Sequence, residues 1–179
     1  QVFDQQSLDF KSPHLLRLRR LVRAKAITLL LTSVTLGEIR SHLDRDAKES
    51  LRILRNYKRA SKLVKRILPN PHFEPSDEND LREALHREFD EFLKSCAIEV
   101  VNATNVCPEQ VLHNYFAPVP PFGEQGKKHE FPDAFAIGAI RDWSERTGDL
   151  AYVVSGDKDW KRSFLRNKKL VQLDNIEQL

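Results

Sequence analysis

Four acidic residues have types and spacings that could build a metal site: Glu38, Asp133, Asp157 and Asp159. Glu38 lies one helical turn beyond a predicted strand, Asp157 and Asp159 directly follow another, and Asp133 begins a predicted helix. Carboxylates that meet at one sheet edge repel one another, so such a cluster is tolerated mainly with cations present. Their hard oxygen atoms select Mg²⁺ or Mn²⁺. Such ions polarise a phosphate and lower the pKa of an attacking water, so these acids, together with a basic stripe on a predicted helix, indicate phosphodiester hydrolysis.

Two of these acids also have purely structural explanations. Asp133 follows Pro132 in the first turn of an apolar helix, where the helix dipole favours a carboxylate. Taken alone, a plain cap explains Asp133 better. Glu38 stands three residues after Thr35, which is the spacing of a capping box. Only the expected convergence of these acids with Asp157 favours a metal site over two caps.

Convergence is expected because strands and helices alternate along the chain. Residues 27–31 and 150–154 are continuous apolar runs, typical of strands buried on both faces. Shorter strands are predicted at 97–101 and 169–173. Helices are predicted from residue 13, from about 35 to 68, and over 81–94, 107–117 and 131–147. The alternation predicts a mostly parallel sheet with right-handed crossovers, in which ligands bind beyond the carboxyl ends of the strands.

A basic stripe with helical spacing runs along the long second helix: Arg52, Arg55, Arg59, Lys62 and Lys65. No acidic residue interrupts the charges from Arg52 to Arg66, whereas idle surfaces usually mix both signs. A solvated helix face and a face that contacts phosphates explain this stripe equally well. Lys127 and Lys128 lie in the Pro- and Gly-rich loop before residue 131. They could contact an anionic ligand, although a solvated loop is the simpler interpretation.

The composition sets broad limits on the fold and the partners. With 179 residues, 40% of them hydrophobic and 31% charged, the chain suits one globular domain. Its formal net charge of +3 permits a polyanionic partner without requiring one. Two cysteines indicate a reduced, cytoplasmic setting rather than a disulfide framework. The sequence has no apolar run near the length of a membrane span and no signal-peptide pattern at its start.

Three motifs occur in order along the sequence: Val-Thr-Leu-Gly-Glu-Ile at 34–39, Glu-Phe-Pro-Asp-Ala at 130–134, and Val-Val-Ser-Gly-Asp-Lys-Asp-Trp at 153–160. Together they resemble a PIN domain, and more narrowly the bacterial PIN-like group with a Glu-Phe-Pro-Asp-Ala helix start. The resemblance spans nearly the whole chain. It implies an α/β three-layer sandwich, with a central, mostly parallel sheet and helices on both faces. It also implies an Mg²⁺- or Mn²⁺-dependent nuclease, most often an endoribonuclease, in a family that includes toxins of toxin–antitoxin pairs.

The resemblance assigns roles to particular residues. Glu38, Asp133 and Asp157 match the catalytic acids that hold the metal, and Asp159 matches an accessory metal acid. Ser155 matches a small hydroxyl residue beside the site. Glu130 is either a further acid close to the metal or a charge at the helix start. The basic side chains of the stripe and loop would then position RNA, and the partners implied are RNA, an antitoxin or other protein, and a second copy of the chain.

One departure from the family pattern concerns the start of the chain. The family opens with an apolar strand that ends in Asp-Thr or Asp-Ser, and a polar residue and Val-Phe come next. Gln1, Val2 and Phe3 match the segment directly after that acid. We therefore expect one PIN-like domain over residues 1–179 that lacks its first strand and first acid here.

This departure keeps other functions open. A non-catalytic PIN-like module that binds RNA or a protein would not need the first acid. A doubly wound phosphatase or receiver-type domain would need an acid after its first strand and a lysine after a later one, and it gives no reason for Glu38.

Overall fold

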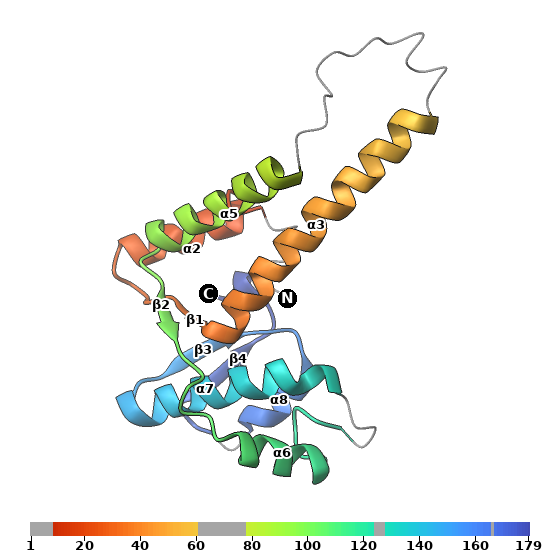
Figure 1. Ribbon diagram of the computed structural model, residues 1–179. Helices are drawn as coiled ribbons and strands as arrows, with labels where there is room; N and C mark the ends of the chain where they lie inside the picture. Colours follow the sequence, from red (N-terminus) through yellow and green to blue (C-terminus); the bar gives the residue numbers. More distant parts are fainter. Residues whose placement is uncertain (1–8, 61–77, 124–127, 166) are drawn as a thin grey trace.

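The computed structural model describes residues 9–60, 78–123, 128–165 and 167–179, with only the backbone for residues 57–60. Its elements alternate between helices and strands (Figure 1). In chain order they are α2 (Pro13–Arg23), β1 (Leu30–Thr32), α3 (Ser33–Ala60), α5 (Glu78–Ser95), β2 (Glu99–Val101), α6 (Pro108–Phe116), η1 (Lys128–Glu130), α7 (Phe131–Thr147), β3 (Ala151–Val154), α8 (Lys158–Phe164), β4 (Leu170–Leu173) and η2 (Ile176–Gln178). The chain is α/β, as predicted.

The strands form two parallel pairs. β1 pairs with β2, with Leu31 opposite Val100, and β3 pairs with β4, with Val153 opposite Gln172. In the described part of the chain these pairs are two separate two-stranded sheets. The predicted parallel arrangement of the strands is therefore confirmed. The central sheet of a three-layer sandwich stays a prediction. Each pair is connected through helices, α3 and α5 for the first and α8 for the second.

Local signals explain where α7 begins and ends. Pro132 occupies the first turn, whose N–H groups have no helical acceptor. Gly148 follows the last turn with φ of 77°, a left-handed conformation that glycine adopts without steric cost. The helix predicted over residues 131–147 is therefore confirmed at both ends. No helix in the described ranges is long and apolar enough to cross a membrane.

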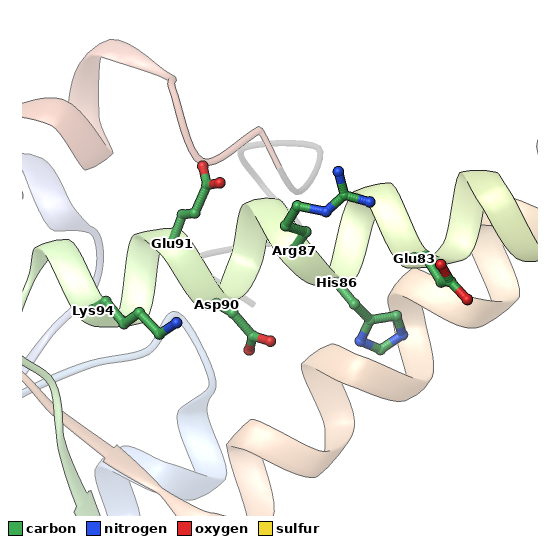
Figure 2. A pocket seen from close by; sticks show the side chains of 6 residues that line it. All are labelled: Glu83, His86, Arg87, Asp90, Glu91 and Lys94. Carbon is green, nitrogen blue, oxygen red and sulfur yellow. The ribbon is translucent and has the colours of Figure 1, made fainter.

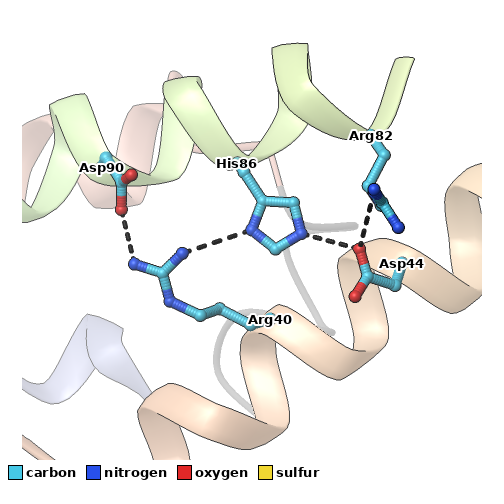
Figure 3. A network of polar contacts seen from close by, with 5 residues as sticks. All are labelled: Arg40, Asp44, Arg82, His86 and Asp90. Carbon is cyan, nitrogen blue, oxygen red and sulfur yellow. Dashed lines mark hydrogen bonds and ion pairs between the residues drawn. The ribbon is translucent and has the colours of Figure 1, made fainter. Parts of the chain in front are cut away.

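The long helix α3 lies beside α5, and polar side chains of the two helices contact each other (Figure 3). Arg40 Nη2 contacts Asp90 Oδ1 at 2.7 Å, and His86 Nε2 contacts Asp44 Oδ1 at 2.7 Å. Arg82 Nε reaches the same Asp44 oxygen atom at 3.9 Å. These contacts connect α3 and α5 beside the apolar cluster that the two helices share. The predicted extension of α3 to residue 68 lies outside the described residues.

The apolar core lies in three clusters around the two strand pairs. The first joins α2, α3 and α5 with β1, around buried Phe10, Leu43 and Phe89. The second joins α7 and α8 with β3 and β4, and contains Ile137. The third lies between α6 and α7 and contains Ala134. Helix α7 is buried on two sides, as its apolar sequence predicted, and each buried side chain the size of Ile137 stabilises the fold by about 1.5–3 kcal/mol. A helix held in this way is a rigid support for the residues at its start.

Candidate active site

Asp133 lies in the first turn of α7 and is half-buried. Its Oδ1 accepts a hydrogen bond of 2.8 Å from Nε1 of Trp160 on α8. The indole also packs edge-on against Phe164, with 5.9 Å between ring centroids. The carboxylate of Asp133 is thus oriented by a side chain from another helix.

Asp157 is the N-cap of α8. Its Oδ1 accepts a hydrogen bond of 2.6 Å from the backbone N–H of Asp159, and its own N–H donates to Oγ of buried Ser155 at 3.2 Å. Nε2 of Gln172 donates to the carbonyl oxygen of Asp157 at 3.1 Å, and also to that of Ser155. The turn from β3 into α8 is therefore held by Ser155 within the turn and by Gln172 on β4.

Asp133 and Asp157 both interact with residues at the start of α8. Asp157 caps the helix, and Trp160, in its first turn, holds Asp133. Asp159 follows Asp157 by two residues, and its Oδ1 accepts a hydrogen bond of 3.1 Å from Nη1 of Arg162. An ion bound by Asp159 would therefore compete with a guanidinium for that carboxylate.

Arg141 provides a second contact between α7 and α8, because its Nη2 donates to the carbonyl oxygen of Ser163. Burial lowers the pKa of the Arg141 guanidinium, and the charge of Glu145 opposes that shift. The two helices are thus joined by one side-chain contact near Asp133 and another farther along α7.

Glu38 lies on α3 and is exposed. The N–H of Thr35 donates to Oγ1 of Thr32 at 3.0 Å, so Thr32 is the capping residue and Thr35 lies inside the helix. The capping-box interpretation of Glu38 is therefore wrong, because the cap lies three residues earlier than the spacing suggested. Glu130 precedes α7 at the N-cap position and makes no side-chain cap bond there.

The donor chemistry of Glu38, Asp133 and Asp157 fits a hard divalent cation, because all three supply carboxylate oxygen atoms. Two of them, Asp133 and Asp157, are oriented through α8. Within the described ranges, however, no three His, Cys, Asp or Glu side chains lie close enough together to hold one ion. The described residues therefore do not assemble a complete metal site.

The predicted RNA-binding residues are only partly described. Arg52 forms hydrogen bonds of 2.7 and 2.6 Å to the two carboxylate oxygens of Glu49, and this pairing raises the pKa of Arg52 and lowers that of Glu49. Arg55 and Lys128 are exposed. Outside the described residues lie the side chain of Arg59 and all atoms of Lys62, Lys65 and Lys127.

Two hollows in the described part of the chain have linings that include neither Asp133 nor Asp157. One of about 390 Å³ lies on α5 (Figure 2), and its described lining residues are Glu83, His86, Arg87, Asp90, Glu91 and Lys94. Both acidic and basic side chains line this hollow, so it presents no uniform positive charge to a polyanion. The other, of about 300 Å³, lies between α6 and α7 beside Val106 and Arg141. Neither is lined by a predicted catalytic acid.

The sequence did not reveal the roles of two residues that contact Asp133 and Asp157. Trp160 stood in a recognised motif but was given no role, and Gln172 was given none. The sequence offers one signal for Gln172, namely a polar residue inside the short apolar strand 170–173. Its contact with Asp157 depends on the pairing of β3 with β4, which the sequence alone does not fix.

A comparison with models of known protein families identifies the family of this chain. A family model described as a PIN domain matches residues 1–160. No curated protein and no solved structure shows a significant match. PIN domains are generally nucleases that bind nucleic acids and use divalent metals. The chain belongs to the PIN domain family.

Proposed function

We propose that this chain is a metal-dependent endonuclease that hydrolyses RNA. The observation that carries the proposal is the arrangement of Asp133 and Asp157 around the first turn of α8, where the indole of Trp160 orients one and the helix start orients the other. A half-buried carboxylate held by a packed aromatic side chain loses little freedom when it binds a ligand, which is the kind of support that functional sites need.

Glu38, Asp133 and Asp157 are the residues proposed to hold Mg²⁺ or Mn²⁺, with Asp159 beside them. A bound divalent ion would polarise the phosphate and lower the pKa of the attacking water. The chain's own contribution is to orient the carboxylates. Trp160 fixes Asp133, while Ser155 and Gln172 fix the turn that carries Asp157.

The basic side chains are proposed to position the RNA backbone. Arg55 and Lys128 are exposed and available to phosphates. Arg52 would have to exchange Glu49 for a phosphate. The proposed set is completed by Arg59, Lys62, Lys65 and Lys127. A toxin–antitoxin pair or a homodimer would be consistent with the proposed function.

The alternative is a non-catalytic PIN-like module that binds RNA or a protein. It is favoured by one observation, that the described residues do not assemble three metal-binding side chains. Incubation of single-stranded RNA with Mn²⁺ and either the wild type, Glu38→Gln or Asp157→Asn separates the two functions. The nuclease proposal expects cleavage by the wild type and little by either variant. RNA binding without cleavage in all three proteins would support the alternative.

A further inference from the structure

Helix α2 carries basic side chains to which the proposed function gives no role. Arg17, Arg20 and Arg23 follow one another at three-residue spacing and are exposed. Residues three apart are neighbours on a helix surface, so these three arginines form one row, the α2 basic row. Leu15 and Leu18 lie on another side of the helix and are buried in the first apolar cluster. The core thus holds α2 in place while the row faces solvent.

No acidic residue in the described part of the chain neutralises the α2 basic row. Residues 10–37 contain no Asp or Glu, and no described acid forms an ion pair with the three arginines. Other exposed arginines do lie beside acids. Arg45 is 3.1 Å from a carboxylate oxygen of Asp46, and Arg82 is 3.9 Å from one of Asp44. The row therefore presents positive charge that these other arginines do not.

The helix dipole accounts for only part of this row. Cations in the last turn of a helix are favoured by the partial negative charge at its carboxyl end. Arg20 and Arg23 lie in the last turn of α2, so the dipole explains them. Arg17 lies earlier, where the effect of the dipole has fallen off. A further reason is needed for three neighbouring arginines without acids.

Positive charge continues from α2 to the end of α5. Burial raises the pKa of the Cys96 thiol, and a hydrogen bond with Ser95 and the charges of Arg19 and Arg23 oppose that shift. The end of α2 therefore lies near the end of α5, where Lys94 is exposed. Two helix ends thus contribute cations to one surface.

This surface is separate from the candidate active site. Only a short segment joins the end of α2 to the amino end of β1, whereas Asp157 follows the carboxyl end of β3 and begins α8. Figure 1 shows α2 apart from α8. A partner bound along the α2 basic row would therefore make its contacts away from the proposed catalytic acids.

The chemistry of the row fits a phosphate backbone better than an acidic protein. A guanidinium group binds a phosphate through two parallel N–H donors. A protein interface also needs apolar or aromatic anchors at its centre, and no large hydrophobic side chain of α2 is among the exposed ones in the described ranges. Interfaces with nucleic acids are instead polar and strongly positive.

We propose that the α2 basic row binds the phosphate backbone of RNA, as a second contact surface apart from the acids that would cleave it. This inference rests on the proposed action on RNA and adds a separate binding surface to it. Two linked contacts bind one strand more tightly than either alone. The row would thus raise the affinity for RNA without taking part in the cleavage step.

The test measures how salt weakens RNA binding. Fluorescence anisotropy follows a single-stranded RNA over a series of salt concentrations, in an Asp133→Asn background that limits cleavage. One variant combines Arg17→Gln, Arg20→Gln and Arg23→Gln, because glutamine removes the charge and keeps a similar helix propensity. Each phosphate contact contributes about 0.7 to the slope of log K against log salt on a single strand, so the slope should become shallower by about 2. Lysine at the same three positions keeps the charges and should retain the parent slope.

The matched control combines Arg45→Gln, Arg82→Gln and Arg87→Gln. It removes the same total charge from exposed arginines that lie beside acids or line a hollow with them, and its slope should equal that of the parent. Equal slopes for the parent and the glutamine variant of the row overturn the proposal. An equal change in both triple variants also overturns it, because net charge alone would then explain the effect.

Two further outcomes separate this inference from its alternatives. If the glutamine variant of the row loses affinity for a polyglutamate peptide but not for RNA, the surface binds an acidic protein and the assignment to RNA is wrong. If the chain binds RNA without cleaving it, the nuclease function fails, while a shallower slope in the row variant alone still supports the α2 basic row as an RNA-binding surface.

Discussion

Trp160 donates its indole N–H to Oδ1 of Asp133 at 2.8 Å, and this hydrogen bond joins the start of α7 to the first turn of α8. The two residues are separated by 26 others along the chain, yet the contact gives Asp133 one orientation. Because Asp157 caps the same helix α8, a single short helix orients two of the proposed metal-binding carboxylates.

Trp160→Phe should lower nuclease activity about 10- to 100-fold, the effect typical of residues that orient a metal ligand. Phenylalanine keeps an aromatic ring against Phe164 but removes the N–H that holds Asp133. The measurement is the rate of RNA cleavage, accompanied by Mn²⁺ titration. Trp143→Phe is the control, because it removes a similar indole bond of 3.1 Å from α7 to Glu99. Equal losses in the two variants would show that the Trp160 bond has no special role.

Gly138→Ala should destabilise the fold. A Cβ at position 138 would lie 2.9 Å from Cγ1 of Val106, and overpacking of this kind costs about 1–3 kcal/mol. Alanine offsets part of this by about 1 kcal/mol through its better helix propensity. In a Val106→Ala background, where the clash is relieved, Gly138→Ala should therefore stabilise. Urea unfolding measures both cases, and the same sign in the two backgrounds would contradict the packing of α7 on Val106.

The contacts between α3 and α5 predict which nitrogen of His86 carries the proton in the neutral ring. Nη1 of Arg40 lies 3.3 Å from Nδ1 of His86, and a guanidinium only donates. Nδ1 must therefore accept, so Nε2 carries the proton and donates to Asp44 at 2.7 Å. Nitrogen NMR should show the Nε2–H tautomer, with a weaker preference in Arg40→Met. A dominant Nδ1–H tautomer in the wild type would mean that this network is arranged differently.

The two cysteines should differ in reactivity. Cys96 is fully buried, and burial raises the pKa of its thiol, whereas Cys107 is exposed. A thiol reagent should label Cys107 quickly in the native protein and Cys96 only on unfolding. Equal labelling rates in the native protein would contradict the burial of Cys96.

Because the pKa of Cys96 is raised in the folded state, its stabilising contribution is complete below the unfolded pKa and is lost as the pH rises through the folded value.

Elements set by local signals could be predicted from the sequence, and those set by tertiary contacts could not. Pro132 and Gly148 delimit α7 because each acts on its own backbone. The cap of α3 was misplaced because Thr32 and Thr35 both offer a hydroxyl, and only the fold selects Thr32. The first strand was predicted at 27–31 but forms at Leu30–Thr32. The apolar side chains of Ile27 and Leu29 pack against the core from outside the strand, so their apolar character alone does not show where the strand begins.

The candidate site shows the same division. The acids Asp133 and Asp157 could be singled out from their motifs. Their supports, Trp160 and Gln172, could not, because both contacts depend on how separate elements dock. The expected convergence of Glu38 with these two acids stays a prediction.

Cleavage of single-stranded RNA in Mn²⁺ by the wild type, Asp133→Asn and Asp142→Asn tests the central claim most directly. Asp142 lies on the same helix, where it accepts hydrogen bonds from Asn105 and Arg146, so its variant controls for loss of an α7 carboxylate. The nuclease account predicts that Asp142→Asn cleaves at the wild-type rate. It also predicts that Asp133→Asn loses more than the roughly 100-fold expected for residues that only support a metal ligand. Equal cleavage by the wild type and Asp133→Asn would contradict the account.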